Sequence, residues 1–433
     1  MHISIPVTEE LPDHFGGRFV LYSVYLEGFL LFKVRYKDLH LWDEKFHRVF
    51  GNLLPAFPPK YYLAMTKSMV EERRLHLEQY LQNLVSDKSI AGSEIFIECF
   101  TKLQLETSKI PKIKMILNVY LADSKQVQVN VQTSDIAERV MEAALYKLGV
   151  SRELMKYFSL FLVHKDSNGV YKVLCLLMKK IAGFELPFIT IWSLSDEQFQ
   201  IDIRKWYFDP SVDRMLIGCT ATVHLMYIQA VQELEMKWSK PTEDQDQKLQ
   251  HLAKTKKKLK FLELMQEVQH YGYLQLAPCS SNYPEVETTV TLSVGNSELI
   301  FGFKLSNGQN ETLCLPIDTL TCWHVKLHAS EKGAVVPKQH QQLEFKMEYR
   351  QGDVIKWFSI HTEQAFLLSS CLKKILQEQP TKCIKQELEI IEKPTVKKSL
   401  KKCVQIGTQG KNKTYLANAE SNPAFDGFPD LEL

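Results

Sequence analysis

Three cations and one aromatic residue within the first 100 residues have types that suit recognition of a phosphorylated ring. Arg35 and Tyr36 stand together, Lys60 follows a proline-rich stretch, and Arg73 comes shortly after it. A guanidinium group donates paired hydrogen bonds to phosphate oxygens, an ammonium group adds a point charge, and an aromatic face covers the apolar side of a ring. By spacing alone, solvated surface cations are the favoured interpretation, because most Lys and Arg side chains are exposed.

The elements that must position these residues follow from the pattern of apolar side chains. Alternation over 18–35, interrupted by Glu27 and Gly28, predicts a hairpin. Apolar residues at helical spacing then predict a helix that ends at Gly51, and three prolines stiffen the loop 54–60. The cations are therefore expected to project from a strand end, a stiff loop and a helix.

A second helix is predicted to carry Arg73. Ser68 and Glu71 have the spacing of a capping box, and the helical period puts Arg73 near the edge of an apolar stripe. The stripe consists of Val70, Leu77, Leu81 and Leu84. We expect the stem of Arg73 to pack against the core edge while its charged head faces a neighbouring groove.

The next region has the pattern of a mixed α and β lobe. Strands are predicted at 115–121, 127–131 and 157–163, and Asp135 and Glu138 are predicted to cap a helix between the second and third of them. Hairpin, helix and strand in this order suggest a ubiquitin-like roll.

Two further regions follow, and the chain then ends in a polar segment. Residues 205–272 show helical periodicity, mainly over 225–238 and 247–270, and predict an all-helical lobe. The period then returns to two before a final helix that starts near Thr362 and ends at Pro380. Antiparallel strands that end in one amphipathic helix are typical of the phosphotyrosine-binding (PTB) type of roll.

Length and composition exclude several classes of protein. The 433 residues suggest two to four packed units, and 45% hydrophobic with 24% charged residues exclude a largely disordered, collagen-like or coiled-coil chain. The 53 Lys and Arg nearly balance the 51 Asp and Glu, which gives no overall basic field for nucleic acid. Any recognition of an anion must therefore be local.

The sequence also indicates the cellular compartment of the protein and whether it binds a structural metal. Apolar runs fall far short of the roughly 20 residues of a spanning helix, and residues 1–10 lack the pattern of a secretory signal. The nine cysteines are singly spaced, which favours reduced thiols and argues against a disulfide framework or a structural zinc site. We expect a cytoplasmic monomer that binds no nucleic acid, no metal and no cofactor.

Catalytic arrangements are weak in this sequence. The stretch 407–412 contains two glycines and a lysine but lacks the spacing and the Ser or Thr of a phosphate-binding loop. His324 and His328 have no acidic or Cys companions at metal-ligand spacing. The sequence therefore favours a binding protein over an enzyme.

Three strings in the N-terminal region, in this order, resemble the phox-homology (PX) domain of the sorting nexins. They are Val34-Arg-Tyr, Pro55-Ala-Phe-Pro-Pro-Lys60, and Glu72-Arg-Arg-x-x-Leu-Glu-x-Tyr-Leu81. The resemblance implies that Arg35 contacts the 3-phosphate of phosphatidylinositol 3-phosphate and that Tyr36 stacks under the inositol. It further implies that Lys60 meets the 1-phosphate, that Arg73 bonds the ring hydroxyls, and that Tyr61, Tyr62 and Leu63 enter the lipid layer.

The resemblance extends over nearly the whole chain. A ubiquitin-like lobe, a helical lobe and a PTB-like lobe in sequence look like a FERM module, and strings at 157–163, 270–274, 295–299 and 322–323 are similar to the PX-FERM group of sorting nexins. The fold class expected is therefore α+β and multidomain. The predicted boundaries are 1–109 for the PX domain, 110–203, 204–272 and 273–384 for the three FERM lobes, and 385–433 for a disordered tail.

In this group the third lobe binds Asn-Pro-x-Tyr or Asn-x-x-Tyr motifs in the cytoplasmic tails of membrane cargo. A peptide of this kind adds as a strand at a sheet edge beside a helix, and 320–327 is the candidate edge. The expected peptide contacts are Trp323 and Val325 on that strand and Leu372 and Leu376 on the helix. The plain alternative is that these residues form core, and the apolar pattern of the helix stops at Gln379 and Pro380.

The last residues mimic a cargo motif. Asn422-Pro-Ala-Phe425 precedes an acidic stretch that ends in Leu433. By resemblance, this tail either recruits a retrieval complex or folds back on the third lobe as an autoinhibitor. A chance motif in a disordered tail is the plain alternative.

These expectations combine into one function. The chain is expected to be a peripheral protein of early endosome membranes that holds integrin-like or lipoprotein-receptor-like cargo and promotes recycling over degradation. The runner-up is a FERM-type linker of membrane and cytoskeleton, or a signalling scaffold. The basic run 254–260 is either a lipid contact or a solvated helix face, and the latter is favoured.

Overall fold

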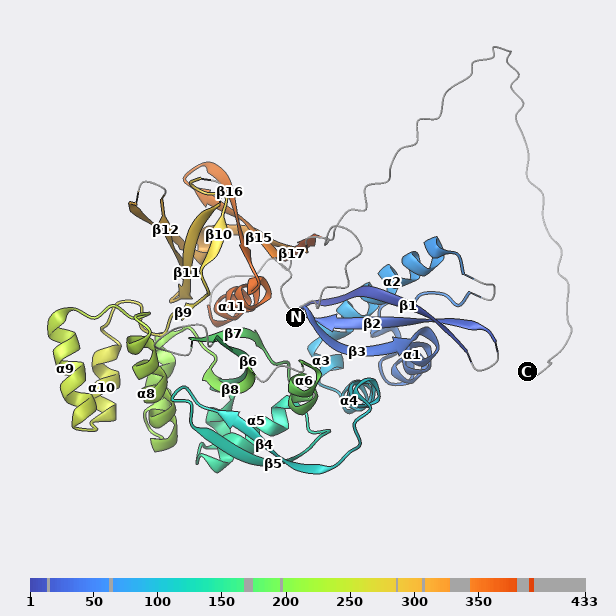
Figure 1. The fold of residues 1–433 in the computed structure, drawn as a ribbon, viewed down its shortest axis with the longest axis horizontal. Helices are drawn as coiled ribbons and strands as arrows, with labels where there is room; N and C mark the ends of the chain where they lie inside the picture. The colour runs from blue at the N-terminus through green and yellow to red at the C-terminus, as the bar shows by residue number, and fades with distance from the viewer. Residues whose placement is uncertain are drawn as a thin grey trace, which may run out of the picture. The chain divides into compact units, whose positions relative to one another are not determined.

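The computed structural model describes residues 1–13, 16–61, 65–166, 174–194, 198–285, 287–305, 308–327, 343–379 and 389–392. Residues Met1–Pro394 form one compact unit. Within it, an N-terminal domain is followed by a ubiquitin-like lobe, a helical lobe and a C-terminal lobe, coloured from blue to red in Figure 1. The expected α+β multidomain class is confirmed.

The N-terminal domain is a three-stranded antiparallel sheet covered by helices. Its elements are β1 (Ile3–Pro12), β2 (Arg18–Leu26), β3 (Phe29–Arg35), α1 (Tyr36–Phe50), a 3-10 turn (Gly51–Leu53), α2 (Lys67–Ser86), α3 (Lys88–Ala91) and α4 (Glu94–Ser108). The predicted hairpin and first helix are confirmed, with Glu27, Gly28 and Gly51 all at positive φ. The elements β1 and α4 were not predicted from the sequence pattern.

The predicted start of α2 was wrong by two residues. The N-cap is Thr66, whose hydroxyl accepts a hydrogen bond from the Met69 N–H at 3.3 Å. Glu71 pairs with Arg74 instead of closing a capping box on Ser68. The apolar stripe is as predicted, because all four of its members are buried: Val70, Leu77, Leu81 and Leu84.

The ubiquitin-like lobe has a five-stranded sheet in the order β5-β4-β8-β6-β7. Its elements are β4 (Lys114–Tyr120), β5 (Gln126–Gln132), α5 (Ala137–Lys147), a 3-10 helix (Arg152–Tyr157), β6 (Phe158–Asp166), β7 (Leu174–Lys180), α6 (Pro187–Leu194) and β8 (Phe199–Lys205). The predicted capping box at Asp135 was wrong, since α5 has Ile136 as its N-cap and the Asp135 carboxylate accepts from the Gln132 N–H at 2.8 Å.

The helical lobe confirms the predicted periodicity. Its elements are a 3-10 turn (Pro210–Val212), α7 (Asp213–Leu216), α8 (Thr220–Glu235), α9 (Glu243–Lys254) and α10 (Lys258–Met265). The run predicted over 247–270 is broken at Lys256, whose φ of 54° takes the chain out of the helix. The helices α8, α9 and α10 therefore lie side by side (Figure 1).

The C-terminal lobe is an antiparallel roll closed by one helix. Its elements are β9 (Leu274–Gln275), β10 (Cys279–Ser281), β11 (Thr288–Gly295), β12 (Glu298–Lys304), β13 (Asn310–Pro316), a 3-10 turn (Ile317–Thr319), β14 (Leu320–Leu327), β15 (Leu343–Gln351), β16 (Val354–Thr362), α11 (Ala365–Glu378) and β17 (Glu389–Glu392). The strands follow the order β13-β12-β11-β10-β16-β15-β14-β17, and β9 pairs with β11.

The strand β17 corrects one expectation. Residues 385–433 were predicted to form a disordered tail, but Glu389–Glu392 lie in register along β14, with Trp323 opposite Glu389 and Lys326 opposite Glu392. The pairing is parallel, whereas the other strand neighbour of β14 is antiparallel. The prediction was therefore wrong for these four residues.

The N-terminal domain and the ubiquitin-like lobe share one apolar core. Phe184, in the turn between β7 and α6, lies with its ring centroid 5.3 Å from Phe96 and 5.5 Å from Phe100 of the N-terminal domain. The buried Gln104 amide donates to the Phe184 carbonyl at 3.1 Å and accepts from the Leu186 N–H at 3.0 Å. This turn therefore completes the N-terminal core.

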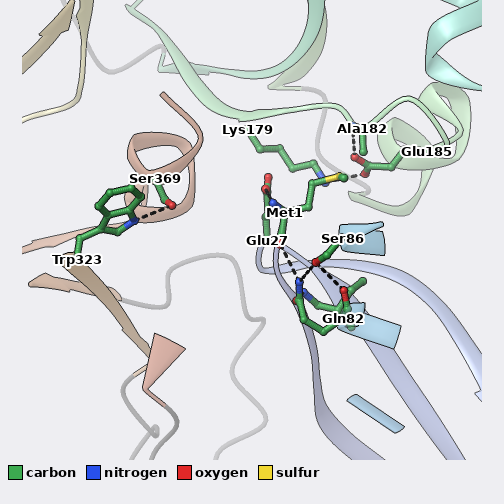
Figure 2. A network of polar contacts seen from close by, with 10 residues as sticks. Met1, Glu27, Gln82, Ser86, Lys179, Ala182, Glu185, Trp323 and Ser369 are labelled. Atoms are coloured by element: carbon green, nitrogen blue, oxygen red, sulfur yellow. Dashed lines mark hydrogen bonds and ion pairs between the residues drawn. The ribbon is translucent and has the colours of Figure 1, made fainter. Parts of the chain in front are cut away.

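A buried ion pair holds the same turn in shape. The Glu185 carboxylate accepts from Lys179 Nζ at 2.6 Å and from the Ala182 N–H at 2.7 Å, as Figure 2 shows. Both side chains of the pair are almost fully buried. Because a buried charge is tolerated only with its partner in place, the pair fixes the conformation that presents Phe184.

We expect Phe184→Ala to destabilise the N-terminal domain by about 3–5 kcal/mol, the range for removing a buried aromatic side chain. Hydrogen exchange of α4 amides, which lie beneath Phe184, measures this loss as reduced protection. Trp192→Ala is the control, because that side chain is 61% exposed and its removal should change stability by less than about 0.5 kcal/mol. Unchanged protection of α4 in Phe184→Ala would contradict the shared core.

Candidate lipid and peptide sites

Arg73 is the central cation of the N-terminal domain. Its guanidinium carbon lies 4.0 Å from the centroid of the Tyr36 ring and 4.5 Å from that of Tyr61. The side chain is 5% exposed, and within the described residues no carboxylate pairs with it and its Nε atom has no hydrogen-bond partner. A buried cation of this kind is costly unless an anion or acceptor completes it.

The proline-rich loop holds this arrangement in place. The Tyr36 hydroxyl donates to the Pro58 carbonyl at 2.9 Å, and an Arg73 amino group donates to the Pro59 carbonyl at 3.4 Å. The Phe57 ring lies 5.5 Å from the Tyr36 ring. The structure therefore brings Tyr36 and Arg73 together, as the sequence predicts.

Arg35 and Lys60 flank this cluster. Arg35 caps the start of α1, and its guanidinium lies 3.8 Å from the Phe19 ring centroid and 3.9 Å from an Asp13 carboxylate oxygen. Lys60 ends the loop and is exposed. We call Arg35, Tyr36, Lys60 and Arg73 the headgroup pocket.

Membrane insertion was predicted for three residues, of which the structure describes only Tyr61. The Tyr61 ring packs on the Arg73 guanidinium, so this side chain belongs to the wall of the headgroup pocket. Tyr62 and Leu63 lie outside the described residues. Insertion of all three residues into the lipid layer stays a prediction.

Sequence reasoning missed Phe19, Phe57 and Asp13 at this site. Phe19 lies on β2 and its ring supports Arg35, whereas Phe57 lies in the proline-rich loop and supports Tyr36. Phe57 belongs to a string that had been singled out, so its ring could have been predicted to face the pocket. Asp13 contacts Arg35 through a turn between β1 and β2, and β1 itself was not predicted.

The second candidate site is the pairing of β14 with α11. Trp323 Nε1 donates to the Ser369 hydroxyl of α11 at 3.0 Å, which ties strand to helix (Figure 2). Trp323 is 1% exposed, Val325 and Leu372 are 0% exposed, and Leu376 is half-buried. Three of the four predicted peptide contacts are therefore core residues in this structure, and their role in peptide binding stays a prediction.

The free edge of β14 is taken up by β17 from Trp323 to Lys326. The helix α11 ends at Glu378, as the sequence pattern predicts, and Glu378 accepts from the N–H groups of Phe208 and Asp209 at 2.9 and 3.1 Å. The predicted tail motif, Asn422, Phe425 and Leu433, lies outside the described residues.

Two other kinds of site are absent from the described part of the chain. No group of three or more His, Cys, Asp or Glu side chains there is placed to hold a metal ion. Among the same residues, no helix combines the length and hydropathy needed to span a membrane.

A PX fold carrying a cationic pocket, followed by three lobes in the FERM order, defines the class of PX-FERM proteins. Family models agree: "PX domain" matches residues 30–102, the nexin 17/27/31 "FERM domain, F1 lobe" matches 115–208, the nexin 17/31 "FERM domain, F2 lobe" matches 209–269, and "Sorting Nexin 17 FERM C-terminal domain" matches 272–380.

Similar proteins identify the family within this class. The chain is 56% identical to sorting nexin-31 of Xenopus tropicalis over 434 residues, covering 100% of both chains, and 43% identical to human sorting nexin-31 over 420 residues, covering 96% of this chain and 94% of the other. It is 34% identical to human sorting nexin-17 over 386 residues, covering 87% and 81%. The chain belongs to the PX-FERM sorting nexins, which are adaptors and not enzymes.

Arg73 and Arg74 are adjacent on α2 but differ in their surroundings. In the described residues, only Arg74 pairs with carboxylates. Arg74 donates to Glu78 at 3.0 Å and to the Ile5 carbonyl at 3.0 Å, and Glu78 is buried. We expect Arg74→Met to destabilise the N-terminal domain by about 3–5 kcal/mol, because it strands a buried carboxylate.

Arg73→Met, in contrast, removes a buried cation that has no carboxylate partner in the described part of the chain. We expect its thermal unfolding midpoint to stay close to that of the wild type. The substitution removes the favourable contact of the guanidinium with the aromatic rings, but it also removes the desolvation cost of the buried charge. Differential scanning calorimetry of both variants measures the contrast. Equal destabilisation by the two substitutions would contradict a ligand role for Arg73.

Proposed function

We propose that the headgroup pocket binds phosphatidylinositol 3-phosphate and so recruits the chain to early endosomes. The observation that carries the proposal is the Arg73 guanidinium, nearly fully buried between two aromatic rings without a carboxylate partner in the described residues. Arg35 and Lys60 add charge beside it. Since Arg73 faces one side of the Tyr36 ring, an inositol ring stacks on the remaining aromatic surface.

The pocket has the chemistry of a phosphoinositide site. A guanidinium with an unpartnered N–H donates to ring hydroxyls, and the half-exposed guanidinium of Arg35 meets a phosphate in the bidentate way that Arg favours. The contact between Arg35 and Asp13 is long, at 3.9 Å, so a phosphate replaces it at little cost. Membership of the PX-FERM sorting nexins supports this assignment over the cytoskeletal linker.

The C-terminal lobe is proposed to bind Asn-Pro-x-Tyr and Asn-x-x-Tyr motifs of receptor tails. The edge of β14 beside α11 accepts a strand, since β17 already pairs there through its backbone. Trp323 and Val325 then shape the groove from within the core. Binding lipid and receptor tail at once holds the receptor on the recycling route, because two weak contacts on one surface reinforce each other.

The proposal also assigns a role to the motif at Asn422–Phe425 near the C-terminus. Asn422, Phe425 and Leu433 would recruit a retrieval complex, or the motif would occupy the groove of the chain's own C-terminal lobe. Either role fits a motif that resembles the receptor tails.

The lipid assignment is tested by vesicle flotation. We expect Arg35→Ala to weaken binding to phosphatidylcholine vesicles containing phosphatidylinositol 3-phosphate by about tenfold or more, because charge-assisted hydrogen bonds are lost. Arg18→Ala is the matched control on the neighbouring strand, since Arg18 is exposed and pairs loosely with Glu10 at 3.6 Å. Equal flotation of wild type and Arg35→Ala would overturn the lipid assignment.

The peptide assignment is tested through β17. Proline at position 390 removes a backbone N–H and cannot continue the pairing with β14, so Ile390→Pro should free the edge and tighten binding of an Asn-Pro-x-Tyr peptide. Isothermal titration calorimetry measures the change, with Ile390→Val as the control that keeps the strand.

The direction of the change in peptide affinity shows whether the peptide binds at the edge of β14 or at another surface. If the peptide uses another surface, its affinity will be the same for Ile390→Pro and Ile390→Val. Trp323→Ala is a poor probe by comparison, because removing a buried Trp costs about 3–5 kcal/mol of stability and would disturb the whole lobe.

A further inference from the structure

Tyr22 is a buried residue beside the headgroup pocket. It lies on β2, the central strand of the N-terminal sheet, where its backbone pairs with Thr8 of β1 and with Val34 of β3. Val34 directly precedes Arg35, so the strand pair that holds Tyr22 also holds the start of the pocket. A strand that is paired on both sides is a rigid support for a binding site.

The hydroxyl group of Tyr22 lacks the partner that a polar group needs at this depth. The side chain is 0% exposed, and its oxygen makes no hydrogen bond of normal geometry with any residue that the structure describes. Buried polar groups nearly always have a partner, because an unpaired one loses its hydrogen bonds to water without replacement. For stability alone, phenylalanine would therefore serve at least as well at this position.

The Arg73 guanidinium is the neighbour of this hydroxyl. Burial raises the pKa of Tyr22, and the charge and hydrogen-bonding capacity of Arg73 oppose the rise, while Tyr36 adds to it. The Tyr22 hydroxyl therefore faces two members of the headgroup pocket. It stands close to a donor but not in the geometry of a formed hydrogen bond.

Arg73 has donor groups to spare. Its Nε atom is without a partner in the described part of the chain, and its bond to the Pro59 carbonyl is long, at 3.4 Å. The rings of Tyr36 and Tyr61 cover the guanidinium and do not use the N–H groups at its edges. An N–H donor and a hydroxyl oxygen, both buried and both unsatisfied, thus lie close together.

A bound ligand supplies the force that brings these two groups into register. The guanidinium donates from more than one edge, so a ligand that binds one edge fixes the plane of the group and leaves another edge for the Tyr22 oxygen. A hydrogen bond from a charged donor is strong, and it is stronger still where water is excluded. The free protein therefore holds a hydrogen bond in reserve for the complex.

We propose that Tyr22 is a positioning residue of the headgroup pocket. When the inositol ring is bound, the Tyr22 hydroxyl accepts a hydrogen bond from the Arg73 guanidinium and fixes the direction in which Arg73 donates to the ring hydroxyls. This role rests on the proposed function and deepens it, because Tyr22 acts on the ligand only through Arg73.

The test is Tyr22→Phe, which removes the hydroxyl and keeps the ring. The full chain is titrated calorimetrically with dibutanoyl phosphatidylinositol 3-phosphate, a soluble lipid whose short chains exclude bilayer insertion from the measurement. We expect Kd to rise by about tenfold, the effect of one hydrogen bond from a charged group. Without ligand, the thermal unfolding midpoint should equal or exceed that of the wild type, because the lost hydroxyl has no partner there.

Tyr80→Phe is the matched control. Tyr80 is also buried in the N-terminal domain, at 2% exposed, but its hydroxyl donates to the Asp43 carboxylate at 2.8 Å. The same substitution there removes a formed hydrogen bond, so we expect a lower unfolding midpoint. We expect its Kd to stay within about twofold of the wild-type value, since separate sites act independently.

A double-mutant cycle tests whether Tyr22 acts through Arg73. In a protein that carries Arg73→Lys, adding Tyr22→Phe should weaken binding no further, because lysine lacks the planar guanidinium that the hydroxyl orients. In a protein that carries Lys60→Ala, the same addition should weaken binding by the full factor.

The outcomes separate this role from the proposed function. If the wild type binds the soluble lipid and Tyr22→Phe has the same Kd, or loses as much affinity in the Arg73→Lys protein, the role of Tyr22 is overturned and the lipid assignment stands. Weaker binding together with a lower unfolding midpoint would indicate a structural role and overturn it too. A wild-type protein that does not bind the lipid would overturn the proposed function itself.

Discussion

Among the residues that the structure describes, the Arg73 guanidinium is enclosed by protein without a carboxylate beside it, and this burial is the main constraint on the N-terminal domain. The free energy spent on burying Arg73 comes from the surrounding core, where Tyr36, Tyr61 and the proline-rich loop enclose the guanidinium. Its neighbour Arg74 shows the usual solution, with two carboxylates and a carbonyl around it. Adjacent arginines on one helix therefore have opposite electrostatic surroundings within the described residues.

The C-terminal lobe depends on a different constraint, which is that a sheet edge needs a partner. An open edge strand exposes a row of N–H and C=O groups, and β14 meets this need through β17, a short strand from beyond α11. Four residue pairs are a small contact. The strand β17 pairs with Trp323–Lys326 and so covers only part of β14, which runs from Leu320 to Leu327.

Much of the fold could be predicted from the sequence, because strong periodicity and Gly turns determine local structure. The hairpin at Glu27 and Gly28, the stripe on α2 and the end of α11 all followed from patterns of this kind. Helix caps were less predictable: Thr66 and Ile136 begin α2 and α5, although capping-box spacing pointed elsewhere, since the spacing recurs by chance. The strand β17 was missed because its pairing is set by tertiary contact.

For the candidate sites, the kinds of residue involved could be predicted better than the contacts that those residues make. Tyr36 and Arg73 are adjacent as expected, yet sequence spacing gave no hint that the Tyr61 ring would lie on the Arg73 guanidinium. Trp323 shows the same limit, because a Trp on a strand beside a helix satisfies both the contact and the core interpretation until burial is known. Residue types indicate what chemistry is available, and only packing decides which face it occupies.

The turn that carries Phe184 has a consequence for modularity. The N-terminal domain takes part of its core from the following lobe, so it is not an independent module. Without that lobe, the face formed by Phe96 and Phe100 would be exposed to water. The shared core also removes the hinge that a linker would provide. Any rotation of the N-terminal domain therefore carries the ubiquitin-like lobe with it.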